Sequence, residues 1–139
     1  CMGKINLQRV ILGGLLAGLV LNGYDFLMYG VILKADFDAA MRAIGKTVAP
    51  SAIYQFIALD FLWGMWLMWL YAAIRPRFGP GPRTAVIAGL FAWLGLGLLH
   101  TASEAPIGIF PARVMMIAVL TQIVALPLAA MAGGKVYSE

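Results

Sequence analysis

Five ionisable side chains stand inside or beside the long apolar runs of this sequence. They are Asp25, Asp60, His100, Glu104 and Arg113. A charged side chain in hydrocarbon costs at least about 2.5–3.5 kcal/mol, so such residues usually face the interior of a helix bundle and have partners there. Carboxyl and imidazole groups together could work as acid and base on a lipophilic substrate, relay protons or bind a transported cation, or ligate a divalent metal.

The candidate catalytic residues are therefore Asp25, Asp60, His100 and Glu104, and we expect Arg113 to supply a counter-charge. Other polar side chains continue the same helix faces, because three- and four-residue steps lead from Asn22 through Asp25 to Tyr29. His100 and Glu104 form an i,i+4 pair. The candidate ligand-binding residues are Asn22, Tyr29, Arg113 and Gln122.

No cofactor follows from these residues. The metal hypothesis uses Asp25, Asp60, His100 and Glu104, but no dense ligand motif supports it. The single histidine excludes bis-histidine haem ligation within one chain and leaves one axial ligand, through His100, open. In the alternative without a site, Asp25 and Asp60 pair with Arg113, His100 or tyrosine hydroxyls and only hold helices together.

The composition places these residues in a bilayer. Of 139 residues, 63% are hydrophobic and only 12% are charged, and the mean hydropathy is +0.90. A soluble domain carries about a quarter charged residues, so this chain has too few to coat a water-exposed surface. The length suits one domain, residues 1–139. The net charge of +4 does not indicate nucleic-acid binding, because no basic stripe with interleaved aromatics lies outside the apolar runs.

Four apolar runs predict an all-α, integral membrane four-helix bundle. Their bounds are about 10–33, 51–74, 84–103 and 112–132. Each run has about 20 or more residues, enough to cross a hydrocarbon core of about 30 Å at 1.5 Å per residue. Gly14 and Gly18 form a GxxxG pattern that lets two helices approach closely. The segments Arg75-Pro76-Arg77 and Gly133-Gly134-Lys135 are expected to end the second and fourth runs respectively.

Between the first two runs, apolar residues at helical spacing predict a short amphipathic helix at the membrane interface, about residues 36–45. We expect Asp36 to cap its start, Asp38 and Arg42 to pair at i,i+4, and Gly45 to end it.

Orientation follows from the basic residues. Six Lys and Arg residues flank the spans on the side of both termini and four on the other side. This excess predicts a multi-pass protein of the cell membrane with both termini in the cytoplasm.

Cys1 is the only cysteine, so no internal disulfide forms. Because Met2 resembles a native start, we expect Cys1 to be an addition ahead of it.

The stretch from Asn22 to Thr47, with Tyr24, Tyr29 and the run Ala40-Met41-Arg42-Ala43-Ile44-Gly45-Lys46-Thr47, resembles a family of small four-helix bacterial membrane proteins classed as a domain of unknown function. The segments Gly89-Leu90-Phe91-Ala92-Trp93-Leu94-Gly95 and Ala129-Ala130-Met131-Ala132-Gly133 are similar in spacing. This chain has Met28-Tyr29-Gly30 where the family has a Trp-Tyr-x-Pro element. The resemblance implies the architecture and assigns no catalytic residue.

Two functions are expected from the sequence. In the first, a polar pocket in the outer half of the bundle binds, transports or processes a small molecule or ion, and whether it is an enzyme stays open. Residue counting along helices of alternating direction places five groups at this level: Asp25, Asp60, His100, Glu104 and Arg113. In the alternative, the chain is a non-catalytic accessory subunit of a larger membrane complex or a homo-oligomer, packing through the Gly14/Gly18 face and the tryptophans of the second run.

Overall fold

The computed structural model describes residues 4–138, and in this range it contains helices and no strand. Four helical spans are long and apolar enough to cross a membrane: Leu7–Ile32, Ala52–Phe78, Pro82–Ile107 and Ala112–Gly134. The second and fourth are the single helices α3 (Ala52–Phe78) and α6 (Ala112–Gly134). The all-α four-helix membrane bundle predicted from the sequence is confirmed. Cys1 and the expectation about it lie outside the described residues.

The first and third spans change helix type along their length. The first joins α1 (Leu7–Leu27) to the π-helix η1 (Met28–Ile32). The third joins α4 (Pro82–Ala92), the π-helix η2 (Trp93–Leu99), the short α5 (His100–Glu104) and the 3₁₀ turn η3 (Ala105–Ile107). The π-helical segments were not predicted.

α3 continues past its expected end, whereas α6 does not. α3 runs through Pro76 to Phe78, and Gly79 ends it with a φ of 84° and an N–H that donates to the Arg75 carbonyl at 2.8 Å. α6 runs through Gly133 and Gly134. It ends at Gly134, inside the segment Gly133-Gly134-Lys135 that was predicted to close it. Gly133 also serves packing, because a Cβ on it would lie 2.5 Å from the Gly13 carbonyl oxygen.

The expected short helix between the first two spans is present as α2 (Lys34–Ala43). It starts two residues earlier than predicted, without a side-chain cap, so Asp36 lies in its first turn. The Asp38 carboxylate pairs with Lys34 at 2.8 Å, whereas Arg42 donates to the Asp38 backbone carbonyl at 3.2 Å. Gly45 follows the helix with a φ of 70°, as expected for a glycine after a C-cap.

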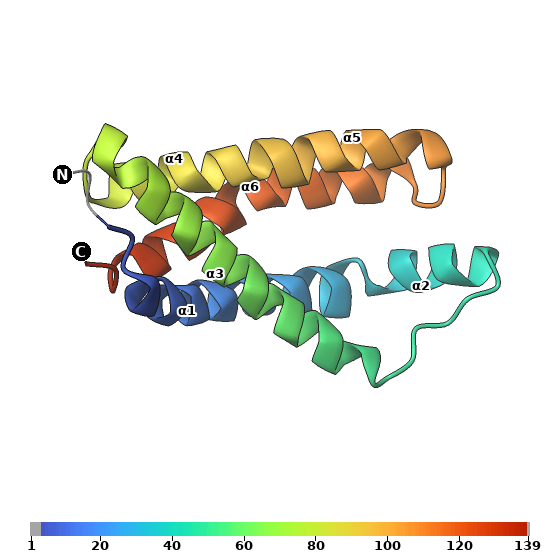
Figure 1. Ribbon diagram of the computed structural model, residues 1–139. Helices are drawn as coiled ribbons and strands as arrows, with labels where there is room; N and C mark the ends of the chain where they lie inside the picture. Colours follow the sequence, from blue (N-terminus) through green and yellow to red (C-terminus); the bar gives the residue numbers. More distant parts are fainter. Residues whose placement is uncertain (1–3, 139) are drawn as a thin grey trace.

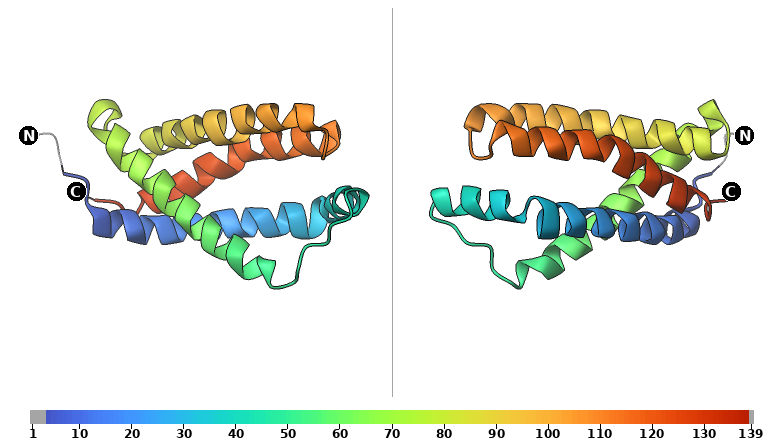
Figure 2. Two further views of the ribbon diagram at one scale, coloured as in Figure 1. Left: turned by 45° about the vertical axis from the view of Figure 1, so that its right-hand side comes forward. Right: turned by 180° about the vertical axis from the view of Figure 1, so that it is seen from behind.

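Both termini lie at one end of the bundle, together with the turn between α3 and α4 (Figure 1). We call this the terminal end. The opposite, loop end carries α2 and the connection between the third and fourth spans. Here α2 turns away from the axis of α1, since the left view of Figure 2 shows α2 nearly along its own axis and α1 from the side. The third and fourth spans run side by side, while α3 crosses α1 obliquely and diverges from it toward the loop end (Figures 1 and 2).

Glycines make the crossing of α1 and α3 possible. A Cβ on Gly64 of α3 would collide with the Gly14 carbonyl oxygen and would lie 2.5 Å from the Gly18 amide nitrogen. A Cβ on Gly14 would lie 2.5 Å from the Met65 Cα. The GxxxG pattern therefore works as predicted, and its partner is another helix of the same chain.

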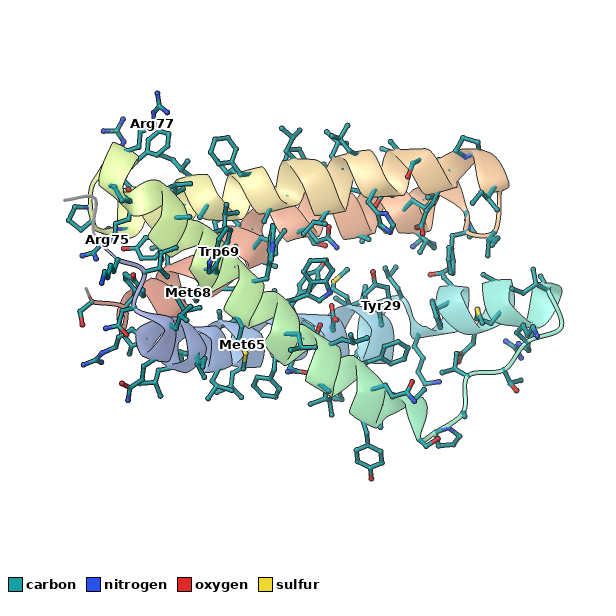
Figure 3. All side chains as sticks on the ribbon, in the orientation of Figure 1. Tyr29, Met65, Met68, Trp69, Arg75 and Arg77 are labelled. Atoms are coloured by element: carbon teal, nitrogen blue, oxygen red, sulfur yellow. The ribbon has the colours of Figure 1, made fainter. Side chains whose placement is uncertain are left out.

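The packed core lies on the terminal side of this crossing. Its fully buried members include Leu67 and Met68 of α3, Ala88 of α4 and Ala129 of α6. Figure 3 places Met65 and Met68 where α3 passes over α1. A smaller buried cluster on the loop side, Met28, Leu33 and Val114, contains no residue of α3, and α1 and α3 diverge there (Figure 1).

The glycine crossing predicts opposite effects for two substitutions in α1. Gly14→Ala should lower the free energy of unfolding by about 1–3 kcal/mol, since the new Cβ meets the backbone of α3. Gly23→Ala should be neutral or stabilising by up to about 1 kcal/mol, because nothing lies within 4 Å of its Cβ and alanine is the better helix former. Thermal unfolding in detergent, followed by circular dichroism, measures both. Equal stability of the two variants would contradict this packing.

Candidate functional site

Three of the predicted catalytic residues lie at one level of the bundle. Asp25, Asp60 and His100 are each 18 residues from the terminal end of their own span, at Leu7, Phe78 and Pro82 respectively. At 1.5 Å per residue this is about 27 Å along each helix. The three groups are thus displaced together toward the loop end, which is the convergence expected from the sequence.

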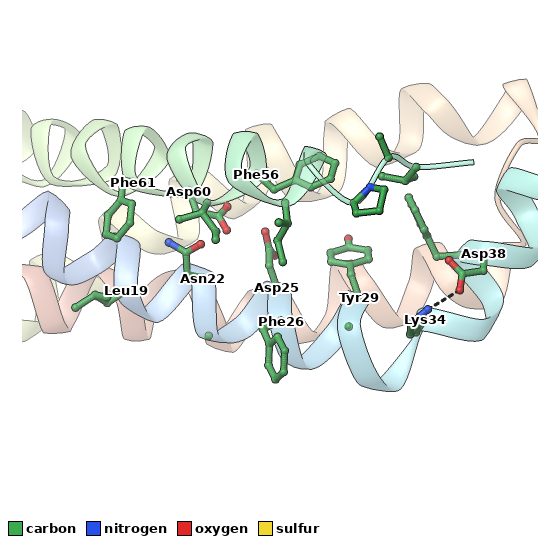
Figure 4. Close-up of a pocket in the computed structure, with 18 residues that line it drawn as sticks. Leu19, Asn22, Asp25, Phe26, Tyr29, Lys34, Asp38, Phe56, Asp60 and Phe61 are labelled. Carbon is green, nitrogen blue, oxygen red and sulfur yellow. Dashed lines mark hydrogen bonds and ion pairs between the residues drawn. The ribbon is translucent and has the colours of Figure 1, made fainter. Parts of the chain in front are cut away.

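Asp25 and Asp60 form a carboxyl pair. Their side chains lie within hydrogen-bonding reach of each other, just beyond the point where α1 and α3 cross (Figure 4). Asp60 is only 8% exposed. None of the ion pairs formed within residues 4–138 involves either carboxyl group. Two carboxylates in contact repel each other unless a proton or another cation lies between them.

On one side of the pair lies a cleft of about 920 Å³ between the first span and the loop-end half of α3. Its polar side chains gather at two places. Asn22, Asp25, Tyr29 and Asp60 lie along its inner part, and the Lys34–Asp38 ion pair lies at its loop end (Figure 4). Apolar side chains form most of the remaining wall: Leu19, Phe26, Val48, Ile53, Phe56, Ile57 and Phe61.

On the other side of the pair lies an inner pocket of about 300 Å³, which reaches toward the third and fourth spans. Asp25, Asp60 and Tyr29 line both spaces, so they stand between them. His100 and Gln122 line the inner pocket, and the Gln122 Oε1 atom is buried without a hydrogen-bond partner among the described residues. The wall also contains Trp63 and Trp66, whose rings meet edge to face at 5.9 Å.

The π-helical segments shape both spaces. η1 contributes Tyr29 to the cleft and the pocket. η2 contributes Leu96 and Gly97 to the pocket, where a Cβ on Gly97 would lie 2.7 Å from the Gln122 Oε1. A π-helical turn widens the helix and redirects its side chains, and such turns occur frequently at functional sites. Tyr29 was predicted as a ligand-binding residue from helical spacing, whereas Leu96 and Gly97 were not predicted to line a pocket.

In the described part of the chain, the tyrosine hydroxyl groups that were expected to pair with Asp25 and Asp60 do not hydrogen-bond to them. The Tyr24 hydroxyl lies 2.6 Å from the Thr121 Oγ1 and 3.2 Å from the Ala118 carbonyl oxygen, so it links α1 to α6. Asn22 donates to the Gly18 carbonyl at 2.9 Å, within its own helix. Tyr54 is 74% exposed. The hydroxyl partners that would make the carboxyl groups purely structural are therefore engaged or remote.

Two expected members of the cluster lie apart from the pair. Arg113 was expected to supply the counter-charge, but its Nη1 lies 3.8 Å from the Asp36 carboxylate at the loop end, and it lines neither space. Glu104 also lines neither space, although it pairs with the His100 Nε2 at 3.3 Å, as its i,i+4 position predicts.

The structure does not assemble the four-ligand metal site. Within residues 4–138, no three His, Cys, Asp or Glu side chains lie close enough to hold a metal ion. The displacement of Glu104 toward the loop end leaves Asp25 and Asp60 as a pair rather than part of a larger ligand cluster.

One of the two features behind the accessory-subunit hypothesis is already used within the chain. Gly14 and Gly18 are buried against α3 and present no open face to a partner. The tryptophans of α3 are partly exposed, at 44% for Trp63, 40% for Trp66 and 44% for Trp69.

The apolar wall of the site was not predicted from the sequence. Phe26, Phe56 and Phe61 line the cleft beside the carboxyl pair, and Trp63 and Trp66 line the inner pocket. From the sequence, aromatic residues in a span suggest lipid contact or packing. The available signal was position, since Phe56 and Phe61 lie one turn or less from Asp60 along the same helix.

No protein-family model, curated protein or solved structure matches this chain. The resemblance to a family of small four-helix bacterial membrane proteins gains no support from these comparisons, and function must be argued from the site.

If the Asp25–Asp60 pair is a functional site and does not hold the helices together, replacing one of its carboxyl groups should not lower the stability of the fold. We expect Asp25→Asn to unfold at the same temperature as the native chain or higher, because the amide removes the repulsion and can donate to Asp60. Tyr24→Phe, one residue away, should lose about 0.5–1.5 kcal/mol with its hydrogen bond to α6. Thermal unfolding in detergent compares them. Asp25→Asn being the less stable variant would assign the pair a structural role.

Proposed function

We propose that this protein binds a small molecule or ion at the Asp25–Asp60 pair and transports it through the bundle. The observation that carries the proposal is the buried Asp60 carboxyl group, which lies beside the Asp25 carboxyl group between two cavities. Within residues 4–138 it has no basic partner. A carboxyl group in hydrocarbon is expensive, and interhelical polar contacts in membranes return only about 0.6 kcal/mol on average.

Helix association does not need this pair. α1 and α3 already hold together through Gly14, Gly18 and Gly64, and α1 is linked to α6 through Tyr24. A buried carboxyl pair that is not needed for assembly is typical of a functional site.

Transport is favoured over simple binding because the pair has space on both sides. The cleft of about 920 Å³ and the inner pocket of about 300 Å³ meet at Asp25, Tyr29 and Asp60. A molecule held by the carboxyl groups can therefore exchange with either space. The carboxyl pair would hold the transported species or the proton that replaces it.

We further propose that the protein lies in the cell membrane with both termini in the cytoplasm. Figure 3 places Arg75 and Arg77 at the end that holds both termini. The excess of basic residues on that side supports this orientation. The pair then lies in the half of the bilayer away from the cytoplasm.

Ligand-dependent stability tests the proposal. A ligand that binds only the folded protein at 100 times its Kd adds about 2.7 kcal/mol to the free energy of unfolding. We expect one of three probes, Na⁺, Mg²⁺ or tetraphenylphosphonium, to raise the unfolding temperature of the native chain in detergent. Asp25→Asn and Asp60→Asn should lose this increase, whereas Asp36→Asn should keep it. An equal increase in all variants, or none with any probe, would contradict the proposed function.

Orientation is tested with cysteines placed at the two ends of the bundle in a Cys1→Ser background. Thr47 and Ser138 are exposed at the loop end and the terminal end respectively. In intact cells, a membrane-impermeant maleimide should label Thr47→Cys and should reach Ser138→Cys only after permeabilisation. The reverse pattern would place both termini outside.

A further inference from the structure

We propose that the ligand of the cleft is a lipophilic organic cation, with its charged group at the Asp25–Asp60 pair and its apolar body against the aromatic wall. This inference rests on the proposed function and names the substrate class of the same site.

The shape of the cleft requires an organic ligand. A space of about 920 Å³ is within the range of pockets that hold drug-sized molecules and far exceeds what a bare ion fills. Its walls are mostly apolar, and the carboxyl groups of Asp25 and Asp60 lie at the inner part (Figure 4). The complementary molecule has a bulky apolar body and a single polar head.

The charges of the cleft require that head to be positive. Every ionisable group that lines the cleft is known: Asp25 and Asp60 at the inner part, Lys34 and Asp38 at the loop end, and Tyr29 between them. Lys34 is neutralised by Asp38 at 2.8 Å, so no unpaired basic group faces the inner part. An anionic head would meet two carboxyl groups, whereas a cation would relieve their repulsion and could lie against the aromatic rings.

The inner pocket adds a second, independent indication. The buried Oε1 of Gln122, which accepts no hydrogen bond among the described residues, lies on the far side of the same pair. Unsatisfied carbonyl oxygens and carboxyl groups are all acceptors, so both sides of the boundary are prepared for a donor or a positive charge.

The cleft opens within the membrane-crossing part of the bundle, where a lipophilic cation would dissolve. Phe26 is 67% exposed and Phe56 is 52% exposed, although both lie within spans that cross the membrane. At that depth the surroundings are hydrocarbon, so the cleft opens sideways between α1 and α3. A lipophilic cation partitions into the bilayer and can enter from there without crossing the loop end.

Two ions of the same size and apolar surface, tetraphenylphosphonium and tetraphenylborate, test the inference. Each is titrated separately into the detergent-solubilised protein by calorimetry, with protein-free micelles as the blank. We expect the phosphonium to bind at least tenfold more tightly than the borate. Asp60→Asn should weaken phosphonium binding at least tenfold, and Asp36→Asn, the same substitution outside the cleft, should leave it unchanged.

The apolar wall is tested by Phe56→Ala, which should weaken phosphonium binding several-fold. Phe91→Ala is its control, because Phe91 is similarly exposed, at 50%, but lines neither space. Folding of every variant is verified by thermal unfolding. Equal binding of both ions, or phosphonium binding that survives Asp60→Asn, would overturn the inference. Asp-dependent binding of Na⁺ or Mg²⁺ without phosphonium binding would also overturn it and leave the proposed function standing.

Discussion

The close crossing of α1 and α3 determines where this bundle is tightly packed and where it opens. Gly14, Gly18 and Gly64 bring the two backbones into contact, and no side chain could occupy the space between them. Because the helices cross at an angle, contact at one level requires separation at another (Figure 1). The packed core fills the terminal side of the crossing, and the cleft opens on the loop side.

The carboxyl pair owes its position to the same crossing. Asp60 lies one helical turn from Gly64, and Asp25 lies two turns from Gly18, so both appear where the helices begin to diverge. Closer to the crossing there would be no space for a ligand, and farther out the two carboxyl groups would no longer meet. The fold thus places the cleft and the carboxyl pair together, on the side of the crossing where α1 and α3 diverge.

The sequence predicted the architecture well, because a bilayer imposes length and apolarity on each span. It also predicted that Asp25, Asp60 and His100 share a level, since depth follows from residue counting along alternating helices. Residue counting does not predict where a side chain lies around the bundle at a given level. Arg113 shares the loop end with the cluster but pairs with Asp36, and residue counting cannot distinguish these partners. α3 continues through Pro76, which was predicted to end it, and stops at Phe78 before Gly79. The π-helical segments, which place Tyr29 and Gly97, follow no pattern that side-chain periodicity reveals.

We expect the Asp25–Asp60 pair to receive a positive charge from its ligand. The chain has only four aspartates, at positions 25, 36, 38 and 60, so carbon-13 labelling of aspartate gives a carboxyl spectrum that two Asp→Asn variants suffice to assign. Solid-state NMR in lipid bilayers, with and without tetraphenylphosphonium, reports on each carboxyl group directly. The account predicts that the signals of Asp25 and Asp60 shift on addition of the cation, while those of Asp36 and Asp38 stay in place. Unchanged signals for the pair at saturating cation would contradict it.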